Sequence, residues 1–223
     1  MKRSSINRYL AEAATFFAEN YFTLPPFASW TPKDWQQRRK EATELRTQRL
    51  GWDITDFNSG NFETRGLTLF TLRNSRPATP ETAKPYAEKI MQVRNGQLTP
   101  FHYHVKKTED IINRGRAGNG RLAVQLYSST REGRFANDPF IVVCDGISRS
   151  VEAGGIVLLG PGESITLPPH LYHAFHAIDG DALIGEVSST NDDDTDNYFY
   201  EPTGRYPEIE EDEPPQFLLC TEY

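Results

Sequence analysis

The segment His102-Tyr103-His104-Val105-Lys106-Lys107-Thr108-Glu109 is the most informative part of this chain for both fold and chemistry. Only five histidines occur in 223 residues, and this segment holds two of them. The other three lie close together further along the chain: His170, His173 and His176. Alternate side chains of a β-strand share one face, so His102 and His104 can present two imidazoles to one point. Glu109 and one histidine of the later cluster would complete a metal site.

Short apolar segments with strand-like composition recur after residue 51. They are residues 67–72, 122–127, 140–143, 155–159, 163–167, 172–177 and 182–187. Turn-forming pairs such as Asn95-Gly96 and Asp145-Gly146 separate them. Many short strands at near-regular intervals predict an all-β sandwich or barrel. Neither βαβ alternation nor a glycine-rich phosphate loop appears, which argues against a nucleotide-binding α/β fold.

The first fifty residues have a helical pattern instead. Apolar residues recur at helical spacing over residues 5–17. A second helix is predicted to begin after the N-cap Thr31 with Pro32 in its first position. We expect this helix to continue to Leu50 and to stop at Gly51.

Charge and cysteine content bear on the class of partner. The formal net charge is −7, and the densest basic segment, residues 36–49, alternates with Glu41 and Glu44. This pattern indicates a solvated helix face, so we expect no nucleic-acid partner. No secretory leader and no run of ~20 apolar residues is found, so we expect no membrane association. Cys144 and Cys220 form no pattern and are typical of reduced thiols in a cytoplasmic protein.

Two segments have a spacing that resembles a known superfamily. They are Gly96-x5-His102-x-His104-x4-Glu109 and Gly162-x5-Pro168-x4-His173. This spacing is similar to that of the two motifs of the cupin superfamily, whose small β-barrel holds a metal through three histidines and one glutamate. The resemblance implies four metal ligands: His102, His104, Glu109 and His173.

His170 is the one departure from the superfamily pattern. The second motif usually has glycine two residues after its proline, and here that position is His170. His170 is therefore an alternative fourth ligand. We favour His173, because it occupies the matched position on the following strand. His176 is expected to face the other way and to be structural.

The resemblance extends beyond these motifs to the D-lyxose ketol-isomerase family of cupins. It covers the opening helices with residues 24–27 and three longer stretches: residues 99–115, 185–197 and 204–213. Membership implies a mainly β protein, a cupin-type β-barrel (jelly roll) with an N-terminal helical extension. We expect residues 1–52 to pack as helices on a barrel formed by residues 53–223, which includes an acidic C-terminal segment, as one structural unit.

The implied activity is metal-dependent aldose–ketose isomerisation of D-lyxose to D-xylulose and of D-mannose to D-fructose, with Mn²⁺ or another divalent metal. Three imidazoles and one carboxylate leave open positions on a metal for a sugar carbonyl and its neighbouring hydroxyl. A carboxylate would then move a proton between C1 and C2 through an enediol. The sequence does not rank the two sugars.

Candidate catalytic residues are Lys107, Glu201 and Glu186. Lys107 follows the histidine pair, although a surface hairpin lysine is the alternative interpretation. Glu201 lies among three aromatic residues, where desolvation would raise its pKa, and Glu186 ends an apolar strand. Each glutamate has a solvated position as its alternative. Lys89 and Arg205 are candidate substrate-binding residues.

Two other functions remain open from the sequence. The same ligand set also serves dioxygenases and decarboxylases, which oxygen consumption or CO₂ release would reveal. A non-catalytic sugar-binding cupin would bind a pentose without turnover. For any of these, a homodimer is the expected assembly of an enzyme of this size.

Overall fold

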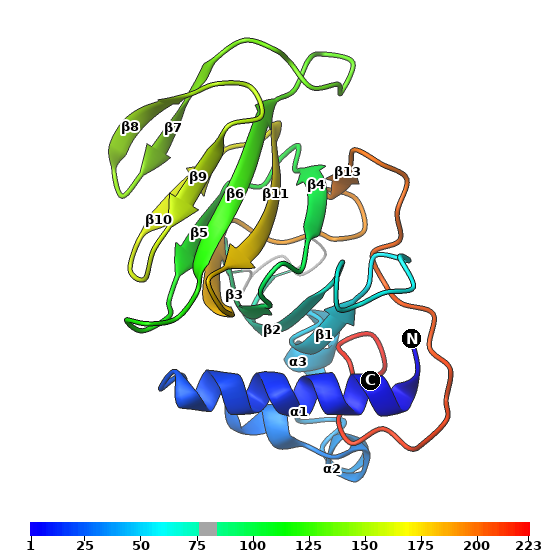
Figure 1. Ribbon diagram of the computed structural model, residues 1–223. Helices are drawn as coiled ribbons and strands as arrows, with labels where there is room; N and C mark the ends of the chain where they lie inside the picture. The colour runs from blue at the N-terminus through cyan, green and yellow to red at the C-terminus, as the bar shows by residue number, and fades with distance from the viewer. Residues whose placement is uncertain (76–83) are drawn as a thin grey trace.

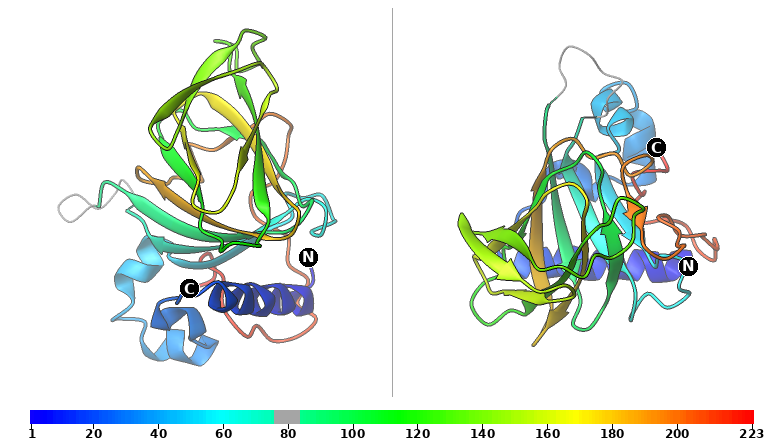
Figure 2. Two further views of the ribbon diagram at one scale, coloured as in Figure 1. Left: turned by 60° about the vertical axis from the view of Figure 1, so that its left-hand side comes forward. Right: turned by 90° about the horizontal axis from the view of Figure 1, so that it is seen from above.

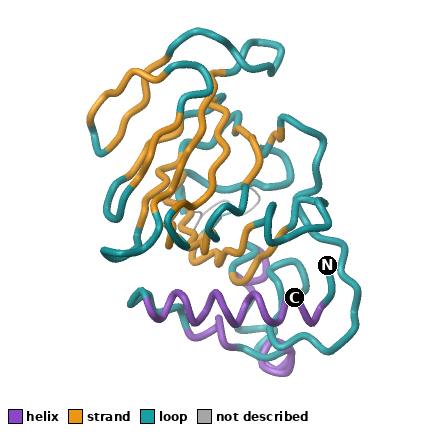
Figure 3. Tube along the Cα trace, in the orientation of Figure 1, coloured by secondary structure: helices purple, strands orange, loops and turns teal. Residues whose placement is uncertain are grey.

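The computed structural model describes residues 1–75 and 84–223, with short helices at the N-terminus and antiparallel strands after them (Figure 1). The helical elements are α1 (Arg3–Glu19), the 3₁₀-helix η1 (Pro26–Ser29), α2 (Pro32–Gln37) and α3 (Thr43–Thr47). In Figure 3 these helices lie together on one side of the strands. Within the described residues, no helix is long and apolar enough to cross a membrane.

The described strands form one eight-stranded and one five-stranded sheet, and all strand pairs are antiparallel. The first sheet has the order β1 (Gly51–Thr55), β2 (Leu67–Arg73), β3 (Ala87–Val93), β12 (Ala182–Ser188), β5 (Glu109–Asn113), β10 (Ser164–Leu167), β7 (Phe140–Cys144) and β8 (Ile147–Val151). The second has the order β13 (Tyr198–Phe199), β4 (Thr99–Tyr103), β11 (Leu171–Ile178), β6 (Arg121–Ser128) and β9 (Ile156–Leu159). Figure 2 shows the two sheets curving around a common interior. The predicted mainly β cupin-type barrel is confirmed.

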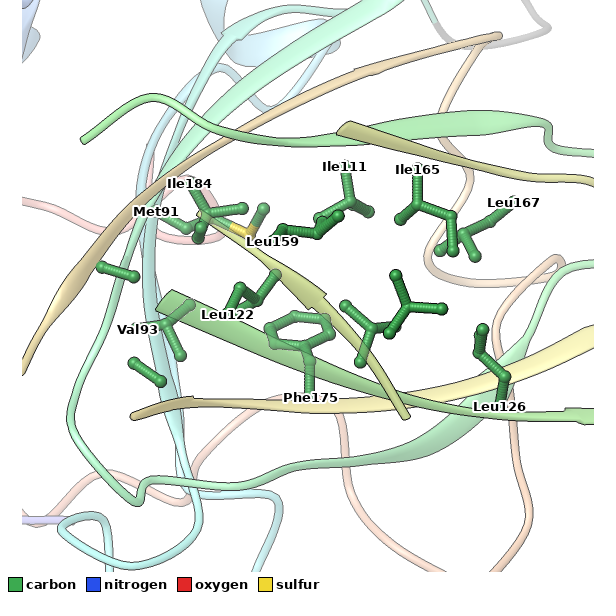
Figure 4. Packing of buried hydrophobic residues seen from close by; sticks show 14 of the residues in the cluster. Met91, Val93, Ile111, Leu122, Leu126, Leu159, Ile165, Leu167, Phe175 and Ile184 are labelled. Carbon is green, nitrogen blue, oxygen red and sulfur yellow. The ribbon is translucent and has the colours of Figure 1, made fainter. Parts of the chain in front are cut away.

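A hydrophobic core fills much of the space between the two sheets (Figure 4). Met91 and Ile184 come from the first sheet, and Leu122 and Phe175 come from the second. Each is at most 3% exposed. Complete burial of a side chain of this size stabilises a fold by roughly 1.5–3 kcal/mol. The interior is therefore a packed core with a cavity at one part of it, where the polar residues described below gather.

A second hydrophobic cluster joins α1 to the outer face of the eight-stranded sheet. Leu10 and Phe17 of α1 are fully buried and share this cluster with Trp52, Phe70 and Ile90. The rings of Phe17 and Trp52 stack with centroids 6.0 Å apart. Because this cluster combines residues from the helix and the sheet, we propose that residues 1–52 and 53–223 form one folding unit.

The predicted single helix from Pro32 to Leu50 is wrong. Its start is as predicted, because Thr31 and Asp34 form a capping box. The helix ends at Gln37, however, and α3 begins only at Thr43. Residues 36–41 are all exposed and include three consecutive cations, so neither packing nor charge pairing supports a continuous helix there. Gly51 opens β1 rather than stopping a helix.

The acidic C-terminal segment, residues 208–215, is mostly exposed but holds the start of α1. The Arg3 side chain, 1% exposed, pairs with Glu211 at 2.6 Å and also with Glu222. The backbone N–H of Arg3 donates to the carbonyl of Glu210 at 2.8 Å. We call Arg3, Glu211 and Glu222 the terminal clasp. It links the start of α1 to the C-terminal part of the chain, and the two chain ends are marked in Figure 1.

Candidate metal centre and active site

Four side chains from three parts of the barrel converge on one point in the interior. His102 lies in β4 opposite His173 of β11, His104 directly follows β4, and Glu109 begins β5 of the other sheet. One potential ligand atom from each lies within 4.8 Å of those from the others. This is close to twice a typical metal–ligand bond of about 2.0–2.2 Å. The structure thus brings together the four residues predicted as ligands.

Backbone carbonyl groups fix the orientation of all three imidazole rings. The Nδ1 atom of His102 lies 2.9 Å from the carbonyl oxygen of Pro100. That of His104 lies 2.5 Å from the carbonyl of Asp196, and that of His173 lies 3.0 Å from the carbonyl of Leu171. Because a carbonyl can only accept, each Nδ1 must donate its proton, which leaves the lone pair of a neutral ring on Nε2.

The electrostatic environment keeps two of these histidines neutral and the glutamate ionised. Burial, together with the neighbouring histidines, lowers the pKa of His102 well below its ordinary value. Burial and the charge of Lys107 lower the pKa of His104 to about 4. Burial opposes the ionisation of Glu109, but Lys107 and the histidines outweigh it and hold its pKa well below the usual range. Neutral imidazoles and a carboxylate are the forms that bind a divalent metal.

Unpartnered atoms show that this donor set fits a cation. Nε2 of His104, Nε2 of His173 and Oε1 of Glu109 are buried and have no hydrogen-bond partner among residues 1–75 and 84–223. Nε2 of His173 lies 3.0 Å from Oε1 of Glu109, and Nε2 of His104 lies 3.7 Å from the same oxygen. With protons on Nδ1, these three atoms are all acceptors that face one another. Buried acceptors in this arrangement repel, and a bound divalent cation would satisfy all three.

A buried ionic network lies beside the ligand group, which we call the cavity network: Lys89, Lys107, Glu109, Glu186 and Asn191. Nζ of Lys107 lies 2.6 Å from Oε2 of Glu109 and 3.0 Å from Oε1 of Glu186. Nζ of Lys89 lies 3.1 Å from the same Glu186 oxygen. The side-chain oxygen of Asn191 accepts from Lys89 at 2.7 Å and from Lys107 at 3.3 Å. Lys107 therefore occupies one oxygen of Glu109 and leaves the other for a metal.

Opposite charges outweigh the effect of burial on the pKa values of Lys107 and Glu186. Burial disfavours the charged form of Lys107, but Glu109 and Glu186 outweigh it and raise the pKa of the ammonium. It also disfavours the charged form of Glu186, but Lys107 and Lys89 hold the pKa of that carboxyl below its ordinary value. The surface-hairpin alternative for Lys107 is excluded, because its side chain is 2% exposed.

The ligand group and the charged residues of the cavity network line one cavity, which with its mouth holds about 510 Å³ of empty space. Arg205 also lines the cavity, and its Nη2 atom pairs with Asp53 at 2.5 Å and with Asp193 at 3.2 Å. Its Nη1 atom is buried and has no hydrogen-bond partner within the described residues. The same is true of the side-chain oxygen of Asn197. Apolar side chains, Met91 among them, also line the cavity.

The structure does not bring Glu201 to this cavity. Its side chain is 69% exposed and pairs with Arg65 at 3.3 Å. The expected desolvation is therefore wrong. Phe199 of the same aromatic run lines the cavity, whereas Tyr200 stacks on Phe135 with ring centroids 3.7 Å apart and is 44% exposed. The run of aromatic residues thus divides between two environments and encloses no carboxylate.

The two other histidines lie outside the ligand group. His170 is exposed and has a φ of 64°, the left-handed conformation that glycine adopts most easily. The turn thus keeps the backbone shape that the usual glycine supplies, with a histidine in that position. His176 is partly buried on β11 and is not a member of the group. We therefore retain His173 as the proposed fourth ligand.

Sequence reasoning assigned no role to several residues of the site. Asn191 contacts both lysines, Asp193 pairs with Arg205, and Asp196 contacts the segment that carries His104. The only signal in the sequence was that all three lie in residues 185–197, a stretch that resembles the sugar isomerase family. Nothing in a run of polar residues reveals which of them turn inward.

Known proteins resemble this chain along its entire length. The model of the D-lyxose isomerase family matches residues 1–223. A D-lyxose/D-mannose isomerase of Escherichia coli O157:H7 is 50% identical over 226 residues, which cover 100% of this chain and 98% of that protein. A D-lyxose/D-mannose isomerase of Serratia proteamaculans is 47% identical, with the same coverage of both chains.

Solved structures agree on the fold. The L-ribose isomerase of Geodermatophilus obscurus superposes with a TM-score of 0.57, covering 94% of this chain and 98% of that one. The sequence identity of this pair is 16%, so the likeness concerns the barrel and its helices alone. The match of the family model over the whole chain, with two relatives near 50% identity, shows that this chain belongs to the D-lyxose isomerase family.

Proposed function

We propose that this protein is a metal-dependent aldose–ketose isomerase that interconverts D-lyxose with D-xylulose and D-mannose with D-fructose. The observation that carries the proposal is the set of three unpartnered acceptor atoms beside a buried lysine–glutamate network in one cavity. The names of the two full-length relatives support the choice of sugars.

His102, His104, Glu109 and His173 would hold the metal, for which we propose Mn²⁺. A divalent cation at this position would polarise the sugar carbonyl and its neighbouring hydroxyl as a Lewis acid. Imidazole and carboxylate donors suit Mn²⁺ and also accept other first-row divalent ions, so the ligand set does not exclude them. Lys107 contributes by neutralising the second oxygen of Glu109, which fixes the carboxylate in place.

Glu186 is the carboxylate that we propose to take the proton from C2 of the aldose and return it to C1. Oε1 of Glu186 is held by Lys107, Lys89 and the hydroxyl of Ser188, whereas among the described residues Oε2 accepts one hydrogen bond, from Lys89 at 3.4 Å. Oε2 is thus the oxygen that is more available as a base. We propose that Lys107 assists catalysis by holding Oε1 of Glu186 and Oε2 of Glu109 in place with its ammonium group.

Arg205 is the proposed binding group for sugar hydroxyls. Asp53 and Asp193 fix one side of its guanidinium, and Nη1 remains as a buried donor without a partner. Lys89, which we predicted as a second substrate-binding residue, is already engaged by Glu186 and Asn191. We therefore propose that Lys89 keeps Glu186 ionised and in position.

A sugar panel with metal-depleted and reloaded protein tests the proposal. The purified protein is stripped with a chelator, reloaded with Mn²⁺ and incubated with D-lyxose, D-mannose and D-xylose. We expect ketose formation from the first two sugars and little from D-xylose, which has the opposite configuration at C2. Stoichiometric Mn²⁺ without ketose above background from D-lyxose and D-mannose would refute the isomerase. Oxygen uptake or CO₂ release would then favour another cupin enzyme.

We also propose that the protein is a cytoplasmic homodimer. Free, buried Cys144 and Cys220 are consistent with a reducing compartment. Ile141, Ile147 and Ile156, on β7, β8 and β9, are 54–63% exposed, which suits burial against a second copy. Light scattering coupled to size-exclusion chromatography would give the mass in solution, and a mass of one chain would contradict the dimer.

A further inference from the structure

Asp196 is a buried residue outside the ligand group whose carboxylate and carbonyl oxygens all accept hydrogen bonds from one short segment, residues 104–107. It lies in the loop between β12 and β13 and is 3% exposed. Its Oδ1 atom accepts the backbone N–H groups of Val105 and Lys106, both at 2.9 Å. Its Oδ2 atom accepts the N–H of Lys107, also at 2.9 Å. Three consecutive N–H groups thus converge on one carboxylate, as in an anion-binding nest.

The backbone of Asp196 reaches the preceding residue of the same segment. Its carbonyl oxygen accepts the Nδ1 proton of His104 at 2.5 Å. One residue therefore fixes the ring orientation of a proposed ligand and the three backbone groups that follow it. These three groups lie between His104 and Glu109, and the last belongs to Lys107 of the cavity network.

We propose that Asp196 is the positioning residue of the metal centre. It sets the distance and direction between His104 and Glu109 by clamping the turn between them. Charge-assisted hydrogen bonds to a buried carboxylate are stronger than neutral ones, and they also offset the cost of burying its charge. The inference rests on the metal centre of the proposed function and adds a residue that contacts neither metal nor sugar.

A change at Asp196 should therefore act on metal affinity first. Replacing residues that orient metal ligands typically costs about 10–100-fold in metal affinity or activity. In Asp196→Asn, the amide NH₂ opposes one of the three backbone N–H groups, and the negative charge is lost. The turn can then move, although the four ligand side chains remain. Added Mn²⁺ should largely restore activity, because the catalytic groups are unchanged.

Asp192→Asn is the matched control. Asp192 lies in the same loop, and its carboxylate also accepts backbone N–H groups, from Asp194 at 3.1 Å and from Thr195 at 3.2 Å. The experiment compares Mn²⁺ binding by electron paramagnetic resonance in the wild type and both variants, with circular dichroism to confirm folding. We expect the dissociation constant to rise by about 10–100-fold in Asp196→Asn and to stay within about threefold in Asp192→Asn.

Equal Mn²⁺ affinity in two folded variants would overturn the inference, whether both resemble the wild type or both are weakened. If Asp196→Asn does not fold, Asp196→Glu takes its place, since it keeps the charge but displaces the carboxylate by one methylene. Undiminished affinity in that variant would equally overturn the inference. A wild type that binds Mn²⁺ but forms no ketose defeats only the proposed reaction, whereas one that binds no divalent metal defeats the metal centre and the inference together.

Discussion

The cavity network and the terminal clasp are both ionic clusters built around a buried cation, and they differ in what they leave unsatisfied. In the clasp, Arg3 is 1% exposed and directs its guanidinium at Glu211 and Glu222, whose side chains are 57% and 22% exposed. In the cavity, Lys107 and Glu186 are both nearly inaccessible. Beside them, one oxygen of Glu109 and two histidine nitrogens have no partner.

The difference separates a cluster that stabilises the fold from one that is arranged for chemistry. The carboxylates of the clasp remain hydrated, so the pairing can favour folding without a ligand. The acceptors beside the cavity network are dehydrated and face each other, which costs free energy until a cation binds. Substitutions in the two clusters should therefore change different measurements.

The largest effect is expected from removing a ligand. His173→Gln takes away one of the atoms that converge with Glu109, and loss of Lewis-acid catalysis should reduce kcat/KM by about 10³-fold or more. Bound metal, measured by mass spectrometry of the dialysed protein, should fall well below one equivalent. His176→Gln on the same strand is the control and should keep both properties. Full metal content in His173→Gln would contradict the ligand assignment.

A smaller loss of activity is expected from replacing Glu186, the proposed base. Glu186→Gln keeps the shape of the side chain but cannot accept a proton, so kcat should fall by about 10²–10³-fold. Metal content should stay near that of the wild type, because Glu186 is not a ligand. Steady-state kinetics at saturating Mn²⁺ measure the loss. If instead the metal is lost and kcat recovers with added Mn²⁺, Glu186 supports the centre and is not the base.

A substitution in the terminal clasp should lower stability and leave catalysis unchanged. Arg3→Met removes hydrogen bonds between charged groups but leaves carboxylates that water can reach, so the free energy of unfolding should fall by about 1.5–3 kcal/mol. Urea denaturation measures this change, and kcat/KM should stay within about twofold. A large fall in kcat/KM in the folded variant would show that the clasp and the cavity are coupled.

The smallest effect is the pH dependence of the clasp. The hydrogen bond from Arg3 outweighs other effects and lowers the pKa of Glu211 below its ordinary value of 4.5. Stabilisation from this group is therefore complete above pH 4.5 and is lost as the pH falls through the lower, folded-state pKa. The stability difference between wild type and Arg3→Met should shrink below pH 4.5 in urea titrations. A difference that grows in acid would contradict this assignment.

Much of the fold was predictable because its signals are local. Short apolar segments between turn residues indicated seven of the strands, and the helical spacing in residues 5–17 indicated α1. The second helix was predicted too long because its middle, residues 38–41, has favourable spacing but is exposed and buries no apolar face. β3 was missed, although it carries Lys89 into the cavity.

The prediction of Glu201 failed for a related reason. Neighbouring aromatic residues suggested a desolvated carboxylate, but β13 ends at Phe199 and the chain beyond it carries Glu201 to the surface, where its side chain is 69% exposed. Phe199 turns into the barrel, whereas Tyr198 and Tyr200 remain 46% and 44% exposed. Glu201 and its aromatic neighbours are therefore close in the sequence but lie in different environments in the structure.

The sequence by itself indicated three of the proposed ligands, because two histidines at alternate strand positions and a glutamate lie within eight residues. The choice of His173 as the fourth rested on the resemblance to the second cupin motif. Only the tertiary structure decided what surrounds them. Lys89 meets Glu186 through the pairing of β3 with β12, and Asp196 meets residues 104–107 from about ninety positions away. Such contacts depend on strand register and loop closure, which form only when the whole barrel has folded.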